Sequence, residues 1–86
     1  MEKVYVVTTC VENTEEQVEV VNRIVRVTKN GEIAKETMEF LVEEVKENYD
    51  ENNFAYSEDE TENVVIITRE DMLEKVTIEI TEMGVE

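Results

Sequence analysis

The chain has 86 residues and a formal net charge of −15, from 23 acidic side chains against eight basic ones. A chain of this length builds a single domain with a small core, so we expect one domain over residues 1–86. This much negative charge repels nucleic acid and anionic membranes, which excludes direct binding to either. It attracts basic surfaces, and large basic surfaces belong mostly to proteins that hold nucleic acid. The composition therefore predicts a basic DNA-binding protein as the partner.

The composition also argues against catalysis and against a bound metal or other cofactor. The chain has no histidine and one cysteine, so a zinc site would depend almost wholly on carboxylates, and the commonest general base is missing. No glycine-rich phosphate loop occurs, because the only glycines are Gly31 and Gly84. Asp50–Asn53 and Ser57–Glu62 are rich in oxygen ligands, but neither has the spacing of a calcium-binding loop. We expect no enzyme, no cofactor and no metal site.

We expect a cytoplasmic protein, because the sequence has no recognisable membrane span or signal peptide. The longest apolar runs, Val4–Val7 and Val64–Ile67, have four residues each, which is too few to span a membrane. The first residues lack the basic and then apolar layout of a signal peptide. Cys10 is the only cysteine, so no internal disulfide is possible. Its apolar neighbours favour a reduced, buried small side chain over a reactive thiol.

In chain order, the first predicted element is a strand at Lys3–Val11, which is rich in β-branched and aromatic residues, and Glu12–Glu16 is a polar connection. The next segment, Gln17–Lys29, is ambiguous. Thr14–Gln17 reads as a capping box and basic residues trail the segment, which favours a helix. Its many β-branched residues favour a strand that pairs with the first one as a long hairpin. We favour the strand, and the helix remains open.

Asn30 and Gly31 then form either a turn or the start of the next helix. Glu32–Asn48 is the clearest element of the chain, an amphipathic helix. The side that we expect to cover a sheet consists of Ala34, Thr37, Met38, Leu41, Val42, Val45 and Tyr49. On the other side, six carboxylates fall within roughly 80° of the helical wheel. They are Glu32, Glu36, Glu39, Glu43, Glu47 and Asp50, called the acidic stripe below.

After the helix exits through Asp50–Asn53, we expect a short strand at Phe54–Tyr56 and an acidic turn at Ser57–Glu62. Asn63–Thr68 is apolar on both faces, which predicts a central strand. Arg69–Glu74 is a polar connection in which Thr68 and Asp71 are spaced to cap a single helical turn.

Lys75–Thr81 alternates cleanly, with Val76, Ile78 and Ile80 pointing inward. The elements together predict an α+β fold in the order β-β-α-β-β-β. It is an antiparallel sheet of four to five strands, covered on one face by a single amphipathic helix.

The negative charge is concentrated between Glu43 and Glu62, where nine acidic residues stand against one basic residue, Lys46. Like charges three or four residues apart on a helix destabilise it by about 0.2–0.5 kcal/mol per pair. A stripe that lowers stability in this way suggests use as a binding surface, although a merely solvated face is the simpler alternative.

The stripe spaces its charges about 5.4 Å apart, against about 3.4 Å along one DNA strand. A comparable density requires that the fold set the later acids beside the helix. The candidate partner-binding residues are Glu36, Glu39, Glu43, Glu44, Glu47, Asp50, Glu51, Tyr56, Glu58, Asp59, Glu60 and Glu62.

The segment Ala55–Thr68 resembles the phage uracil-DNA glycosylase inhibitor family. The shared residues are Ala55, Tyr56, Glu58, Glu62, Asn63, Val64 and Thr68, and Glu43-Glu44-Val45 resembles the acidic helix that precedes this hairpin in the family. The resemblance implies a compact antiparallel sheet with helical cover, inhibition by DNA mimicry, and Glu43 or Glu44 as a contact to the enzyme. The family's edge-strand Q-E-S-I motif has no counterpart, since the corresponding Arg26–Lys29 is basic.

These features predict a small acidic inhibitor of phage type, a monomer or small homo-oligomer acting in the cytoplasm of a bacterial host. It would block the nucleic-acid groove of a glycosylase, of a restriction or CRISPR nuclease, or of a polymerase accessory factor. Carboxylates would replace phosphates there, and Tyr49, Phe54 or Tyr56 could supply an apolar anchor. The alternatives are an immunity or antitoxin protein that neutralises a basic nuclease, and a highly soluble structural or assembly domain.

Overall fold

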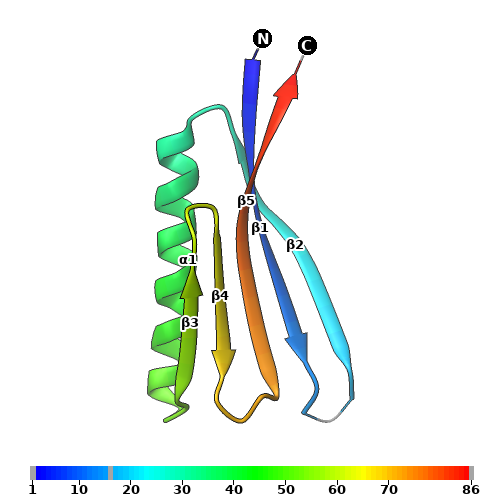
Figure 1. The fold of residues 1–86 in the computed structure, drawn as a ribbon, viewed down its shortest axis with the longest axis vertical. Helices are drawn as coiled ribbons and strands as arrows, with labels where there is room; N and C mark the ends of the chain where they lie inside the picture. The colour runs from blue at the N-terminus through cyan, green and yellow to red at the C-terminus, as the bar shows by residue number, and fades with distance from the viewer. Residues whose placement is uncertain (1, 16, 86) are drawn as a thin grey trace.

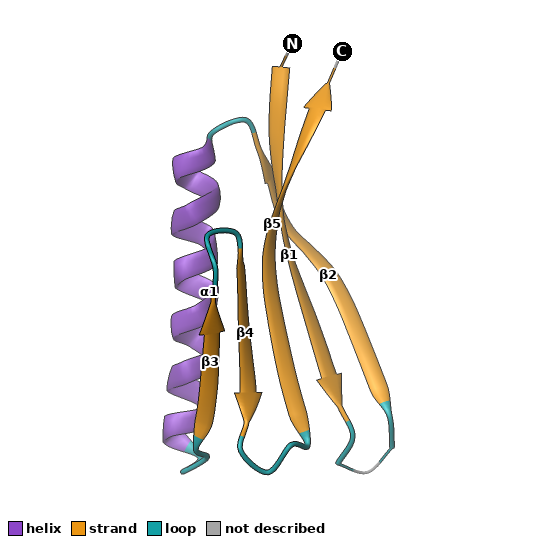
Figure 2. Cartoon of the chain, viewed as in Figure 1, coloured by secondary structure: helices purple, strands orange, loops and turns teal. Residues whose placement is uncertain are grey.

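The computed structural model describes residues 2–15 and 17–85 and has the predicted α+β architecture (Figures 1 and 2). One antiparallel sheet has the strand order β2-β1-β5-β4-β3, and a single helix covers one of its faces. The elements are β1 (Glu2–Asn13), β2 (Glu19–Thr28), α1 (Gly31–Glu51), β3 (Tyr56–Glu60), β4 (Val64–Arg69) and β5 (Glu74–Val85).

The ambiguous second segment is a strand, as favoured, and β1 and β2 form the expected long hairpin. Their register runs from Tyr5 opposite Thr28 to Asn13 opposite Glu19, with one irregularity between Val7 and Thr8. Pairing with β1 suits the β-branched side chains of β2, and this outweighs the helix-start signals in front of it. The predicted capping box includes Glu16, which lies outside the described residues.

Asparagines cap helix α1 at both ends, Asn30 before it and Asn52 after it. The Asn30 side chain accepts hydrogen bonds from the backbone N–H of Glu32 at 2.9 Å and of Ile33 at 3.4 Å. This satisfies two of the free donors of the first turn, and Gly31 is therefore the first helical residue. At the other end Asn53 has φ 59°, the left-handed conformation common just after a helix C-terminus.

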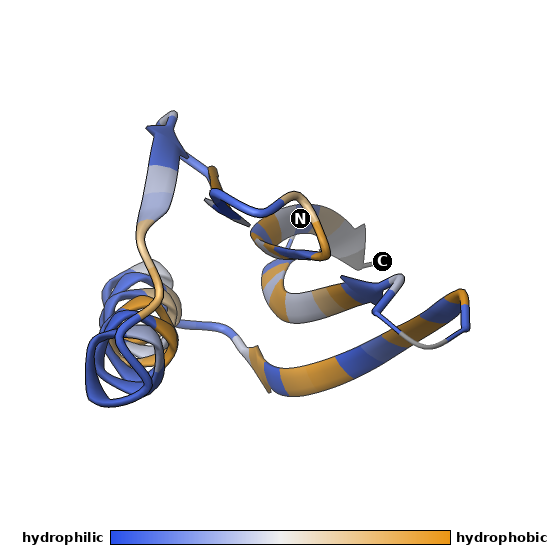
Figure 3. Ribbon diagram, turned by 90° about the horizontal axis from the view of Figure 1, so that it is seen from below, coloured by the Kyte–Doolittle hydropathy of each residue, from blue (hydrophilic) through white to orange (hydrophobic). Residues whose placement is uncertain are grey.

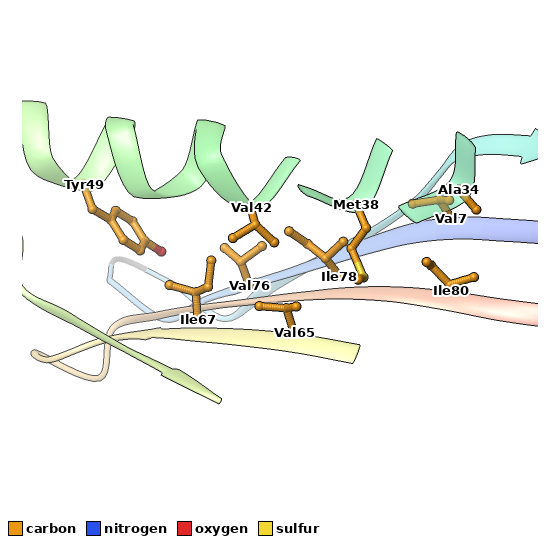
Figure 4. Close-up of a cluster of buried hydrophobic side chains, with 10 residues drawn as sticks. All are labelled: Val7, Ala34, Met38, Val42, Tyr49, Val65, Ile67, Val76, Ile78 and Ile80. Atoms are coloured by element: carbon orange, nitrogen blue, oxygen red, sulfur yellow. The ribbon is translucent and has the colours of Figure 1, made fainter. Parts of the chain in front are cut away.

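The core lies between α1 and the facing side of the sheet (Figure 4). Val76, Ile78 and Ile80 point inward as predicted, and Tyr5 packs against the core from the same side of the sheet. Burying these side chains is the main stabilising contribution to a fold of this size. The buried hydrophobic residues are Val7, Ala34, Met38, Val42, Tyr49, Val65, Ile67, Val76, Ile78 and Ile80.

The acidic segment after the helix was predicted wrongly. The strand there is not Phe54–Tyr56 followed by a turn over Ser57–Glu62 but β3, Tyr56–Glu60, which pairs with β4. Acidic residues have low strand propensity, but at a sheet edge their charged side chains can remain in water. The backbone pairing of β3 with the apolar β4 therefore outweighs that low propensity. β4 lies between β3 and β5, which confirms its predicted non-edge position.

The predicted helical turn between β4 and β5 is also wrong. Arg69 ends β4, and the Asp71 carboxylate accepts hydrogen bonds from Arg69 Nε and from the Leu73 N–H. Met72 follows with φ 62°, which is incompatible with a right-handed helical turn.

Cys10 was expected to be buried but is only half-buried. It lies opposite Asn22 and Thr77, on the sheet face that α1 does not cover. The uncovered face is visible in Figure 3, which looks along the helix. None of the helices in the described chain is both long and apolar enough to cross a membrane.

Candidate functional site

The acidic stripe of α1 lies on the side of the helix that faces away from the sheet. All six of its carboxylate residues are exposed, and the outer side of the helix is hydrophilic in Figure 3. Their placement follows from the helical period, because Ala34, Met38, Val42 and Tyr49 hold the opposite side in the core.

Strand β3 runs beside α1 and brings further carboxylates to the stripe (Figure 1). Glu39 and Glu43 of the helix and Glu58 and Glu60 of β3 line one shallow groove of about 200 Å³. The fold thus assembles acids from two segments of the chain. We call the stripe together with Glu58 and Glu60 the acidic surface.

Lys46 lies within this groove and forms an ion pair with Glu58. The hydrogen bond to the Glu58 carboxylate raises the pKa of Lys46 above its usual value, so the lysine stays charged. One of the two β3 carboxylates is therefore already neutralised by the protein. The free negative charge of the groove comes mainly from Glu39, Glu43 and Glu60.

Several predicted site residues lie elsewhere. Asp59 alternates with its neighbours along β3 and therefore points to the sheet face that the helix does not cover. Glu62 lines a separate hollow near the start of α1, together with Glu32, Lys35 and Glu82. Glu44 and Glu51 face the other flank of the helix, where they line a groove of about 510 Å³ with Glu47 and Glu74. Of the predicted acids that are not in the stripe, four thus lie outside the groove between α1 and β3. Asp59 is on the other face of the sheet, and Glu44, Glu51 and Glu62 lie in hollows that they share with the stripe residues Glu47 and Glu32.

The three aromatic residues proposed as anchors, Tyr49, Phe54 and Tyr56, pack together at one end of the hydrophobic core. Tyr49 is 1% exposed and packs edge-on against Phe54, with the ring centroids 6.2 Å apart. Tyr56 is half-buried, with its centroid 5.7 Å from that of Tyr49. Stacking of this kind stabilises the fold and leaves little of the three rings for a partner.

Phe40 is the exposed aromatic residue that sequence reasoning missed. It is 63% exposed on α1, between the stripe and the groove that the helix forms with β2. That groove has a volume of about 420 Å³ and includes Val25, Ile33 and Leu41. The signal was present in the sequence, since Phe40 falls outside the apolar side of the helical wheel.

A second polar cluster, at the end of the sheet, has a structural role. Arg69 is 4% exposed, with its guanidinium 4.1 Å from the Phe54 ring centroid and its Nε 2.8 Å from the Asp71 carboxylate. This hydrogen bond holds the pKa of Asp71 below its usual value. Nη2 of Arg69 makes no hydrogen bond and lies 3.7 Å from the Glu15 carboxylate. The sequence pattern predicts Arg69 in a polar connection, whereas Arg69 ends β4 and belongs to this cluster.

Within residues 2–15 and 17–85, no three acidic or cysteine side chains converge in a way that could hold a metal ion. Comparison of the chain with family models, with curated proteins and with solved structures finds no significant match.

Proposed function

We propose that this chain is a small acidic inhibitor that mimics DNA and occupies the nucleic-acid groove of a DNA-handling enzyme. The observation that carries the proposal is the acidic surface, where exposed carboxylates of α1 continue across a shallow groove to β3. The whole-chain charge of −15 favours encounter with a basic groove and repels other acidic molecules.

In the proposed mechanism the carboxylates take the places of backbone phosphates. Arginine and lysine side chains of the target bind carboxylates by the same charge-assisted hydrogen bonds that they make to phosphates. Glu39, Glu43 and Glu60 are the carboxylates best placed for this, because Glu58 already pairs with Lys46. Phe40, exposed on the flank of α1 that faces β2, supplies the apolar contact that charge alone does not give.

The candidate targets are phage-restricting enzymes with basic grooves. Uracil-DNA glycosylase is the first to test, because Ala55–Thr68 resembles the inhibitor family of that enzyme and forms the β3–β4 hairpin. Restriction and CRISPR nucleases are further candidates, because their basic grooves also bind the phosphate backbone of DNA.

The test is capture of a target from bacterial lysate by the tagged protein, with and without excess duplex DNA. We expect a DNA-binding enzyme to be captured, to be released by DNA, and to bind more weakly as salt rises. The variant Glu39→Lys/Glu43→Lys/Glu47→Lys should lose the target. The matched control, Glu12→Lys/Glu70→Lys/Glu79→Lys, changes the net charge equally at exposed positions away from the surface and should retain it.

Two results would contradict the proposal. A partner that DNA does not displace indicates an immunity-type protein whose surface is specific for a toxin. Equal binding by both triple variants shows that the acidic surface is only solvated.

A further inference from the structure

Strand β2 forms one edge of the described sheet and is unusually exposed for a strand of ten residues. Five of its apolar side chains are between 38% and 66% exposed, namely Val20, Val21, Ile24, Val25 and Val27. Soluble proteins usually protect sheet edges with short strands or charges, because an open edge can pair with another strand. β3, at the opposite edge, has both protections, with five residues of which three are acidic.

The charge of β2 is opposite in sign to that of the molecule. The strand carries Glu19, Arg23 and Arg26, a net charge of +1 within a chain of net charge −15. Two copies of so acidic a chain repel each other over most of their surfaces. The β2 edge is the place where they meet with the least repulsion and with apolar side chains to bury.

We propose that a second copy of this chain pairs with β2 in antiparallel fashion across a two-fold axis, with Val21 facing Val21 of the second copy. This register sets Glu19 of each copy opposite Arg23 of the other. Glu19, Val21 and Arg23 lie opposite Asn13, Val11 and Thr9 of β1, so all three share the sheet face on which α1 lies. Residues that pair across antiparallel strands must share a face, and this register meets that condition.

The neighbouring two-fold registers fit less well. A register centred on Arg23 places two arginines opposite each other and runs into the irregularity where Val7 pairs with Arg26 but Thr8 with Ile24. A register centred on Asn22 leaves Glu19 and Arg23 without a charged partner. The Val21 register uses the regular stretch Glu19–Ile24. It pairs Glu19 of each copy with Arg23 of the other, so the two-fold axis gives two ion pairs.

The proposed dimer does not depend on the proposed function. β2 and β3 are opposite edges of the sheet, so dimerisation leaves free the groove between α1 and β3 that Glu39, Glu43, Glu58 and Glu60 line. A two-fold axis that joins two β2 edges in antiparallel fashion stands perpendicular to the sheet. It therefore places both α1 helices, and both acidic surfaces, on the same face.

The test is sedimentation equilibrium of the full chain over a range of concentrations. We expect the mass to rise from the 10.0 kDa of one chain to that of two. Arg23→Glu places like charges opposite each other at two positions, and it should weaken the dimer by about tenfold or more in Kd. The charge swap Glu19→Arg/Arg23→Glu restores both pairs and should restore the dimer. Lys35→Glu on α1 changes the net charge as Arg23→Glu does and should leave the dimer unchanged.

Hydrogen exchange supplies a second readout that does not depend on the mass. Amides of Glu19–Ile24 that face outward should gain protection as concentration rises, in the natural chain and in the charge swap but not in Arg23→Glu. Both changed residues are exposed, so circular dichroism should show an unaltered fold. A mass of one chain at every concentration overturns the proposal. A charge swap that fails to restore the dimer also overturns it, because it excludes the Val21 register.

Discussion

At the residue scale, Met72 is held in an unfavourable backbone conformation. Its φ of 62° is in the left-handed region, which for an L-residue with a side chain is about 1 kcal/mol less favourable than for glycine. Its side chain is 74% exposed, so little packing is lost when it is removed. Met72→Gly should raise the free energy of unfolding by about 0.5–1 kcal/mol in urea denaturation. Met83→Gly, in β5, should lower the free energy of unfolding, and the opposite order would contradict the backbone argument.

Tyr49 contributes both packing and a buried hydroxyl group. Its O–H donates a hydrogen bond of 2.6 Å to Oε1 of Glu74 while the ring lies in the core. Tyr49→Phe keeps the ring but leaves a half-buried carboxylate with one partner fewer. We expect a loss of about 1–2 kcal/mol in the free energy of unfolding near neutral pH. A loss near zero would show that water replaces the hydroxyl group.

The same hydroxyl predicts a dependence on alkaline pH. Burial of Tyr49, followed by its hydrogen bond to Glu74, raises the pKa of Tyr49 above the value of about 10 found in an unfolded chain. The hydroxyl contribution is therefore fully present below about pH 10 and is lost as the pH rises towards the folded-state pKa. Thermal unfolding at stepped pH should show a steeper alkaline loss of stability for the natural chain than for Tyr49→Phe.

At the element scale, the acidic stripe of α1 lowers the stability of the helix that carries it. Glu43 has like charges at both neighbouring turns, Glu39 and Glu47. Glu43→Lys converts these repulsions into attractions and should raise the free energy of unfolding by about 0.5–1 kcal/mol. The same change should weaken binding of the target, so the two measurements move in opposite directions. A variant that gains stability and keeps full binding would show that the stripe is not a contact surface.

At the scale of the whole molecule, the net charge predicts an unusual response to salt. Repulsion among 23 acidic residues destabilises the compact state, and added salt screens it within a Debye length of about 10 Å at 0.1 M. We expect the melting temperature to rise with sodium chloride. The rise should be smaller in Glu39→Lys/Glu43→Lys/Glu47→Lys, whose charge is less negative. A melting temperature that falls with salt would mean that local ion pairs such as Lys46–Glu58 outweigh the general repulsion.

Local patterns in the sequence were enough to predict the helix and most of the strands. The 3.6-residue period identified α1, and the alternation along β5 identified the inward side chains Val76, Ile78 and Ile80. β3 was misplaced because its residues have low strand propensity and become a strand only by pairing with β4. The predicted helical turn after β4 failed because Asp71 binds the Arg69 side chain and Met72 takes a left-handed conformation.

The sequence by itself determined the fold class, the amphipathic helix and the outward stripe of carboxylates, because each depends on periodicities that one element contains. Tertiary structure decided which acids meet: Glu58 and Glu60 share a groove with the stripe residues Glu39 and Glu43, and Glu62 shares a hollow with Glu32. Asp59 points to the other face of the sheet. Tertiary structure also decided that β2 is an exposed edge and that Arg69 is buried. These outcomes depend on strand order and on pairing between segments distant in the chain, which local propensity does not encode.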